Sequence, residues 1–157
     1  MTTLDERQNF IDRYGMLFEH SRWVAERAAQ RLPFPNLHAG LMKVVTDASP
    51  EEQLSLIRAH PELAGKAAVD LTPASATEQA SAGLDRLTQE EFDRFHALNA
   101  AYREKFGFPF IICVRLTDKA GILAAMETRL GNDRDTEIAE ALRQIGEIVR
   151  LRLEYAA

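Results

Sequence analysis

The sequence predicts an all-α fold of about seven or eight helices in a single domain that covers residues 1–157. Apolar residues recur at three- and four-residue steps along most of the chain, and several helix starts carry capping residues. Only the stretch 108–115 departs from this pattern, and no second stretch offers a partner strand, so a β-sheet is not expected. A chain of 157 residues can bury a sufficient core without disulfides.

The N-terminal part of the chain is predicted to form three helices. Helical spacing places the first over roughly residues 4–19. Ser21 is a candidate cap for a second helix that ends before Pro33, and Asn36 is a candidate cap for a third. The residues expected to face the core are Phe10, Tyr14, Leu17, Phe18, Trp23, Val24, Ala28, Leu37, Leu41, Val44 and Val45.

A strong helix start follows at Ser49. Pro50 suits the first helical position, and Glu52 stands three residues after the cap, which is the spacing of a capping box. This helix should end near His60, because the residue before a proline is disfavoured in helical geometry and Pro61 follows. His60 is therefore predicted at a helix C-terminus where the chain turns.

Two further helix starts have the capping-box pattern. Ser75 and Glu78 form one, and Thr88 and Glu91 form the other. The second opens a long helix that Gly107 can close. The apolar and amide positions along this long helix are Phe92, Phe95, Leu98, Asn99, Tyr102 and Phe106.

Residues 108–115 are predicted to be a buried extended segment, because a short apolar run after a helix stop fits an extended chain better than a helix. Helical spacing then returns in two helices, of which the first ends at Gly131. Their expected buried stripes consist of Ile122, Leu123, Met126 and Leu130, and of Ile138, Leu142, Ile145, Val149 and Leu153.

Composition excludes several classes of protein. The formal charge of −5 and the lack of any Lys/Arg run argue against nucleic acid as the main partner. No apolar run reaches the roughly 20 residues of a membrane helix, and the N-terminus lacks the features of a secretory signal. The lone cysteine, Cys113, fits a reducing compartment and rules out multi-cysteine metal sites within one chain. The expected location is cytoplasmic.

Two groups of polar residues could carry chemistry near the middle of the chain. His60 can exchange protons near neutral pH, but it can equally be a histidine that favours the negative end of a helix dipole. Glu78 can act as a base or orient a ligand, with Gln79 as an amide donor. The capping box with Ser75 explains Glu78 without any function, although the two roles are compatible.

The third candidate is the extended segment together with Arg115. A buried non-helical backbone must satisfy its amides and carbonyls, and a polar ligand could do so while Arg115 holds a carboxylate. The alternative is a core segment bonded to protein groups, with Arg115 in a salt bridge. Cys113 lies inside an apolar run, which favours an inert buried thiol over a nucleophile.

Taken together, three motifs resemble those of the OHCU decarboxylases, which act on 2-oxo-4-hydroxy-4-carboxy-5-ureidoimidazoline (OHCU) in urate breakdown. The stretch 60–66, His-Pro-Glu-Leu-Ala-Gly-Lys, is similar to the family motif HP[DE]LAG. The stretch 71–85, with Ser75, Glu78 and Gln79, resembles a second motif, and the stretch 95–115 resembles a third. Glu62 stands where many relatives have Asp, which is a minor departure.

This resemblance implies a compact α-helical fold, a homodimer, and a reaction that needs no metal or organic cofactor. It implies that His60 is the catalytic histidine and that Glu78 is its acidic partner. The C-terminal residues 155–157 are not the peroxisomal address of some eukaryotic relatives, which favours a cytoplasmic enzyme of bacterial type. The residues implied to bind substrate are Pro61, Ser75, Gln79, Phe110, Ile111, Ile112, Cys113, Val114 and Arg115.

The leading hypothesis is therefore decarboxylation of OHCU to (S)-allantoin and carbon dioxide. A first alternative is a catalytically idle helical domain that binds a small ureido or purine-derived ligand. A second is a protein-interaction module that uses the exposed face of the last helix, but this alternative leaves the three motifs unexplained.

Overall fold

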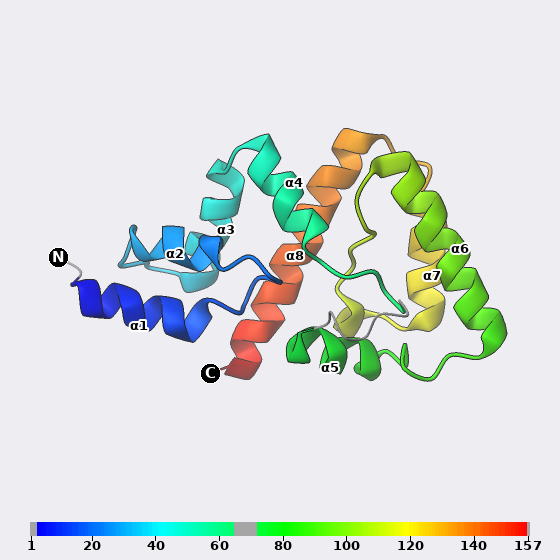
Figure 1. The fold of residues 1–157 in the computed structure, drawn as a ribbon, viewed down its shortest axis with the longest axis horizontal. Helices are drawn as coiled ribbons and strands as arrows, with labels where there is room; N and C mark the ends of the chain where they lie inside the picture. The colour runs from blue at the N-terminus through cyan, green and yellow to red at the C-terminus, as the bar shows by residue number, and fades with distance from the viewer. Residues whose placement is uncertain (1–2, 65–71, 157) are drawn as a thin grey trace. The chain divides into compact units, whose positions relative to one another are not determined.

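The computed structural model describes residues 3–64 and 72–156 (Figure 1). Within these residues all regular structure is helical, which confirms the predicted all-α class and the number of helices. The elements are α1 (Leu4–Tyr14), α2 (Trp23–Ala29), α3 (Leu37–Asp47), α4 (Pro50–Arg58), α5 (Pro73–Ser81), α6 (Gln89–Phe106), the short 3₁₀ helix η2 (Val114–Leu116), α7 (Lys119–Arg129) and α8 (Arg134–Ala156).

Contacts within the chain group it into two compact units. One unit comprises residues 1–59 and 146–157, and the other comprises residues 60–145. Helix α8 contributes to both, since its first half belongs to the second unit and its second half to the first. No helix among the described residues is long and apolar enough to cross a membrane.

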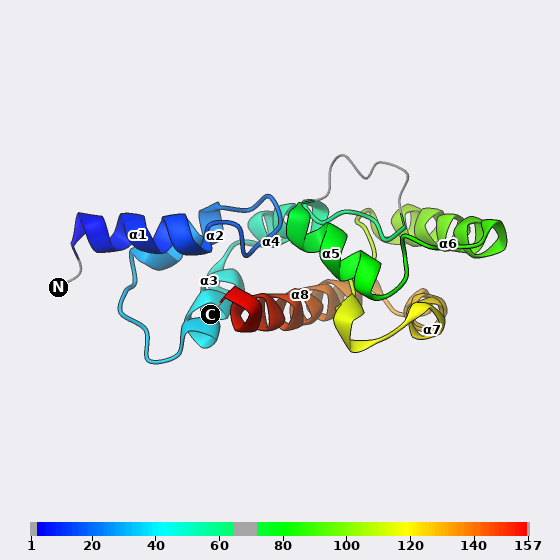
Figure 2. The same ribbon diagram turned by 90° about the horizontal axis from the view of Figure 1, so that it is seen from below.

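The first unit contains α1 to α4. Helices α1 and α2 lie side by side, as do α2 and α3 (Figures 1 and 2). The chain between α1 and α2 is held by Arg152 of α8, whose Nη1 donates to the carbonyl of Leu17 at 2.9 Å and whose Nη2 lies 3.4 Å from Glu19. The fully buried core residues of this unit are Val24, Ala28, Ala29, Leu41, Val44, Leu56 and Ile57.

The start of the chain differs from the prediction at two points. Helix α1 ends at Tyr14 instead of near residue 19, and Leu17 lies in the turns that follow, although it is buried as expected. Ser21 does not cap α2, because its hydroxyl donates to the carbonyl of Glu19 instead. The cap position of α2 is occupied by Arg22.

Other predicted caps are confirmed. The side chain of Asn36 accepts from the amide of Ala39 at 2.9 Å at the start of α3. Ser49 and Thr88 open α4 and α6 with reciprocal capping boxes. Gly107 ends α6 with φ +80°, a conformation that L side chains rarely adopt.

Glu52, which belongs to the capping box of α4, also forms an ion pair with Arg27. This ion pair makes the stability of the fold depend on pH. Arg27 donates to both carboxylate oxygens of Glu52, at 3.1 and 2.5 Å. These bonds, followed by one from the amide of Ser49, lower the pKa of Glu52 from 4.5 to about 2. The unfolded chain therefore binds more protons between these values, so Glu52 contributes stability above about pH 4.5 that is lost as the pH falls towards 2.

We expect Glu52→Gln to flatten the dependence of the thermal midpoint on pH between 2 and 5 relative to the wild type. Some acid sensitivity should remain, because Lys43 and Arg31 lower the pKa of Asp47 in the same way. Thermal unfolding followed by circular dichroism across this range tests the prediction. An unchanged slope in the variant would contradict it.

The second unit contains α5, α6, η2, α7 and the first half of α8. Helices α6 and α7 lie side by side, and η2 packs against α5 (Figures 1 and 2). Tyr102 of α6 lies at the centre of an aromatic cluster, and its ring meets that of Phe110 edge-on at 5.3 Å. The other large buried side chains of this unit include Phe95, Phe106, Phe108, Ile122 and Met126.

Residues 109–113 carry no regular structure, and every residue from Phe108 to Val114 except Ile112 is buried. The prediction of a buried, non-helical segment is therefore confirmed up to Cys113, which has extended backbone angles. Its end differs from the prediction, because Val114 and Arg115 belong to η2.

The buried face of α8 also differs from the predicted one. Ile145 and Val149 are buried as expected, whereas Ile138, Leu142 and Leu153 are only half-buried. The buried face is rotated and takes in two ionised residues, Glu137 and Arg152, together with Ala141. Periodicity alone selects the apolar residues, so it could not identify charged positions that are buried with partners.

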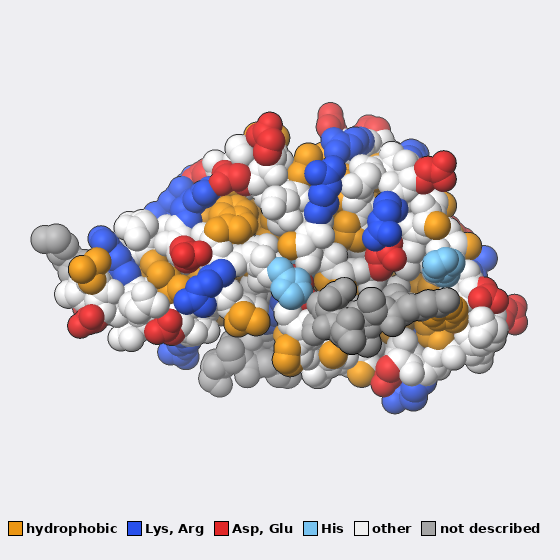
Figure 3. Space-filling model, viewed as in Figure 1, with side chains coloured by type: hydrophobic (Ala, Val, Ile, Leu, Met, Phe, Trp, Pro, Cys, Tyr) orange, Lys and Arg blue, Asp and Glu red, His pale blue; other side chains and the backbone are white. Residues whose placement is uncertain are grey.

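On the face seen in Figure 3, described Lys and Arg side chains are interspersed with Asp and Glu side chains.

Candidate functional site

His60 lies immediately after α4, where the chain turns as predicted. Helix α4 ends at Arg58, Ala59 is its C-cap, and His60 is only 8% exposed. Pro61 follows and is half-buried. The motif residues Gly65 and Lys66 lie outside the described residues.

The turn after His60 is held by two side-chain amides. Asn99 of α6 donates from Nδ2 to the carbonyl of Leu63 at 2.9 Å. Gln79 of α5 accepts at Oε1 from the amide of Ala64 at 3.1 Å. Ala64 has φ +57°, a left-handed conformation that is unfavourable for a residue with a Cβ. These bonds therefore support a turn that the local sequence does not favour.

The bond from Ala64 also defines what Gln79 can offer a ligand. Its Oε1 is engaged, whereas its Nε2 makes no hydrogen bond to the described residues. Gln79 is buried on α5, so Nε2 is a donor in a protected position.

The start of α5 corrects one structural expectation. Thr72 is the N-cap, and its hydroxyl accepts from the amide of Ser75, which therefore stands at the third helical position. The predicted capping box between Ser75 and Glu78 is absent, since Glu78 lies within the helix. The local role that could have explained Glu78 without any function is thus removed.

Glu78 is instead a buried carboxylate that faces an arginine. Its Oε2 lies 4.0 Å from Nε of Arg115 in η2. The side chain of Glu78 is 8% exposed and that of Arg115 is 22% exposed. Burial of two opposite charges is costly unless they are paired. The short distance between Glu78 and Arg115 therefore identifies them as a pair of opposite charges that joins α5 to η2.

The backbone before Arg115 is held on one side. The carbonyl of Ile111 accepts from Nη1 of Arg129 at 2.7 Å, and the amide of Cys113 donates to Oε1 of Gln144 at 2.8 Å. In an extended chain, alternate residues present their backbone groups to opposite sides. Those of Ile112 therefore face away from Arg129 and Gln144, and they make no hydrogen bond to the described residues.

Helix α5 is the element where the candidate residues meet. Gln79 contacts the turn that follows His60, and the adjacent Glu78 contacts Arg115. Ser75, one turn earlier on the same helix, is buried as well. Phe110 and Val114 are buried side chains, so any contact they make with a polar ligand must involve their backbone groups.

The comparisons with known proteins identify the family. The family model described as OHCU decarboxylase matches residues 4–154. A 2-oxo-4-hydroxy-4-carboxy-5-ureidoimidazoline decarboxylase from Haloferax volcanii is 44% identical over 92% of this chain and 87% of the relative. The chain belongs to the OHCU decarboxylase family.

Other members of the OHCU decarboxylase family match at lower identity. The decarboxylase from Mus musculus is 35% identical over 92% of this chain and 84% of its own. Among solved structures, an (S)-allantoin synthase has a TM-score of 0.73 at 30% identity, covering 96% of this chain and 50% of the longer one. An OHCU decarboxylase crystallised with (S)-allantoin has a TM-score of 0.69 at 23% identity, covering 90% and 94%, which shows likeness of fold.

Other parts of this family member offer weaker candidates for a site. A hollow of about 370 Å³ beside α3 in the first unit is lined mainly by apolar atoms. Its cations, Arg31 and Lys43, both pair with Asp47. Among the described residues, no group of three His, Cys, Asp or Glu side chains could hold a metal ion.

The sequence analysis of this OHCU decarboxylase family member did not identify the side chains that bond the backbone of Ile111 and Cys113. Arg129 stands seven residues after Ile122 and three after Met126, so it occupies a position of the buried stripe of α7. A charged residue at such a position is a detectable signal, because a buried arginine requires partners. Its partners, Glu137 and the carbonyl of Ile111, could not be read from periodicity.

Proposed function

We propose that this protein decarboxylates OHCU to (S)-allantoin and carbon dioxide, with His60 and Glu78 as the catalytic residues. The observation that carries this proposal is the arrangement on α5, where the buried Glu78 faces Arg115 and the adjacent Gln79 holds the turn after His60. The relatives that match most of the chain bear the name of this activity. No step of the reaction requires an oxidant or a reductant.

The reaction consists of one bond cleavage, one proton relocation and the uptake of one proton. The bond between ring carbon 4 and the carboxylate breaks, and carbon dioxide leaves. Its electron pair is delocalised over the unsaturated ring as an enolate-like anion, which takes up one proton from solvent on a ring nitrogen. The hydroxyl on carbon 4 becomes a carbonyl as it releases its proton, and the neighbouring carbon that bears the ureido group gains one. The carboxylate, minus carbon dioxide and plus one proton, therefore has the composition of allantoin.

His60 is suited to move that proton. A histidine can both accept a proton from the ring hydroxyl and deliver one to carbon, and the burial of His60 shields it from bulk water. Glu78 acts with it as the acidic partner that orients the reacting groups. Delivery of the proton to one face of the ring yields the (S) product, whereas spontaneous decay yields both hands.

The remaining groups bind the substrate. Arg115 holds a carboxylate or a ring oxygen, because a guanidinium can donate two parallel hydrogen bonds. Nε2 of Gln79 donates to a carbonyl, and the backbone groups of Ile112 bond the ring or its ureido arm. Such donors are arranged before the reaction, so they stabilise charge as it develops. Pro61 and Ser75 border the site.

Circular dichroism during the decay of OHCU freshly generated from urate tests the proposal. We expect purified protein to produce an (S)-allantoin signal quickly, while the control without protein shows slow loss of OHCU and no such signal. An unchanged decay rate with folded protein would reject the activity. If OHCU or allantoin still raised the thermal midpoint, the protein would be the ligand-binding domain that was considered as the alternative.

Three expectations accompany this function. We propose that the protein is a homodimer, that residues 1–157 fold as one domain, and that it works in the cytoplasm. Light scattering coupled to size exclusion measures the mass in solution, and a single cooperative unfolding transition supports one domain. Fractionation of the source cells tests the location.

A further inference from the structure

The segment that carries Ile112 is held from behind by a buried arginine. Nη1 of Arg129 donates to the carbonyl of Ile111 at 2.7 Å. The guanidinium also lies over the ring of Phe110, 4.3 Å from its centroid. Arg129 therefore contacts the two residues that precede Ile112.

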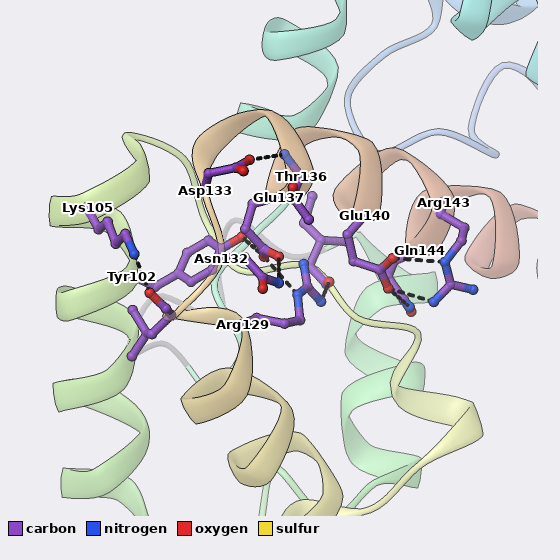
Figure 4. A network of polar contacts seen from close by, with 12 residues as sticks. Tyr102, Lys105, Arg129, Asn132, Asp133, Thr136, Glu137, Glu140, Arg143 and Gln144 are labelled. Atoms are coloured by element: carbon purple, nitrogen blue, oxygen red, sulfur yellow. Dashed lines mark hydrogen bonds and ion pairs between the residues drawn. The ribbon is translucent and has the colours of Figure 1, made fainter.

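Arg129 is itself fixed by a buried carboxylate. Its Nε donates to Oε1 of Glu137 at 2.8 Å, and the hydroxyl of Tyr102 donates to the same oxygen at 2.5 Å (Figure 4). Nδ2 of Asn132 donates to Oε2 of Glu137 at 2.9 Å. Burial, and then the bond to Glu137, raises the pKa of Tyr102, so its hydroxyl stays protonated as a donor over the working range of pH.

A second contact holds the same side of the segment two residues later. Oε1 of Gln144 accepts from the amide of Cys113, while Nε2 of Gln144 donates to Glu140 at 2.9 Å. The bond to Glu140 sets the orientation of the Gln144 amide (Figure 4). Ile111 and Cys113 are thus tied on one side, and the peptide groups of Ile112 between them are presented on the other.

We propose that Arg129 is a positioning residue for the reaction: held by Glu137 and Tyr102, it fixes the carbonyl of Ile111 and so aims the backbone of Ile112 at the substrate. The inference rests on the proposed function. It assigns the buried network a role beyond stability, because small displacements of groups that hold a substrate reduce the rate strongly.

The arrangement requires an arginine. Nε and Nη1 reach two acceptors in different directions, Glu137 and the carbonyl of Ile111. A lysine is a single point charge on a flexible stem, so it can satisfy one acceptor but cannot hold both in a fixed geometry. Arg129→Lys therefore keeps the positive charge but loses the simultaneous bonds to Glu137 and to the carbonyl of Ile111.

The test measures kcat, KM and the handedness of the product for the full chain with fresh OHCU, well below the thermal midpoint of each protein. We expect Arg129→Lys to lower kcat by about tenfold to hundredfold, with a smaller change in KM. The excess of (S)-allantoin in the product should also fall, because a loosely held ring can be protonated on either face. A purely structural role would lower the thermal midpoint and leave these values unchanged in the folded protein.

Arg152→Lys is the matched control. Arg152 is also a buried arginine that donates to a backbone carbonyl and lies beside a buried glutamate, but its carbonyl belongs to Leu17 in the other unit. We expect it to lose thermal stability and to keep kcat within about twofold. An equal loss of kcat in both variants would overturn the proposal, as would a normal kcat and product in Arg129→Lys.

If Arg129→Lys does not fold, Tyr102→Phe tests the positioning role of Arg129 in its place. It removes the bond to Glu137 and keeps the ring in its aromatic cluster. We expect a threefold to tenfold loss of kcat, about half to one logarithmic unit, and an unchanged kcat would overturn the proposal. Absence of activity in the wild type would instead reject the proposed function itself, so the two failures are distinguishable.

Discussion

His60→Asn is expected to lower kcat for OHCU decarboxylation by about 10²- to 10⁴-fold, the range typical of a lost general acid–base group. Asparagine retains a polar side chain of similar reach but cannot exchange protons near neutral pH. His60 follows the C-cap of α4, and the turn after it is held by Asn99 and Gln79, so the fold should persist. Initial rates from circular dichroism at saturating OHCU measure the effect.

His96→Asn is the control for this variant. His96 belongs to the same unit and is exposed on α6, where its ring stacks on Phe92. We expect its kcat to equal that of the wild type. If His60→Asn retained a rate near the wild-type value while folded, His60 would have no catalytic role, and the proton would have to be moved by another group.

Glu78→Gln is expected to reduce kcat/KM by about 10²- to 10³-fold in the folded protein, a loss larger than any decrease in thermal midpoint explains. Gln keeps the size of the side chain but loses the charge that faces Arg115. Because Thr72 caps α5, this substitution does not remove a capping bond. The loss of a preorganised charge acts mainly on the transition state, where charge develops.

Glu52→Gln serves as the comparison for Glu78→Gln, because we expect it to change stability and not activity. Glu52 supports the start of α4 and pairs with Arg27, so its replacement should reduce stability near neutral pH and leave kcat/KM unchanged. Paired thermal unfolding and kinetic measurements on the two variants separate a catalytic carboxylate from a structural one. Equal stability losses with equal activity in both variants would refute the role of Glu78.

Much of the fold could be predicted because helix boundaries depend on neighbouring residues. The boxes at Ser49 and Thr88 and the cap at Asn36 each join residues three positions apart, and Gly107 ends α6 through its own backbone angles. Such interactions are complete within one turn of chain. Such caps can therefore be recognised in the sequence before the packing of the helices is known.

Predictions failed where a nearby residue competed for the same role. Thr72 precedes Pro73 and caps α5, although Ser75 and Glu78 also have the spacing of a capping box. Two adjacent starts of similar quality cannot be ranked by local pattern. The outcome changes the interpretation of Glu78, from a residue of a capping box to a buried carboxylate that faces Arg115.

The candidate site could also be predicted only in part: the residue types were readable from the sequence, but their contacts were not. The sequence motifs identified His60, Glu78, Gln79 and Arg115 as a group, and their chemical types were sufficient to suggest proton transfer and anion binding. Their juxtaposition depends on bonds between distant parts of the chain, such as that of Gln79 with Ala64, fifteen residues away. No periodicity encodes such a pairing.

The sequence by itself determined the all-α class, most helix starts, the family and the residue types available for the reaction. Those properties arise from local capping, from helical spacing and from motifs that read in order along the chain. Only the tertiary structure decided which face of α8 is buried and that Arg129, paired with Glu137, binds the carbonyl of Ile111. Burying two opposite charges is favourable only when they are paired and hydrogen-bonded, and that pairing exists only once α6, α7 and α8 have packed.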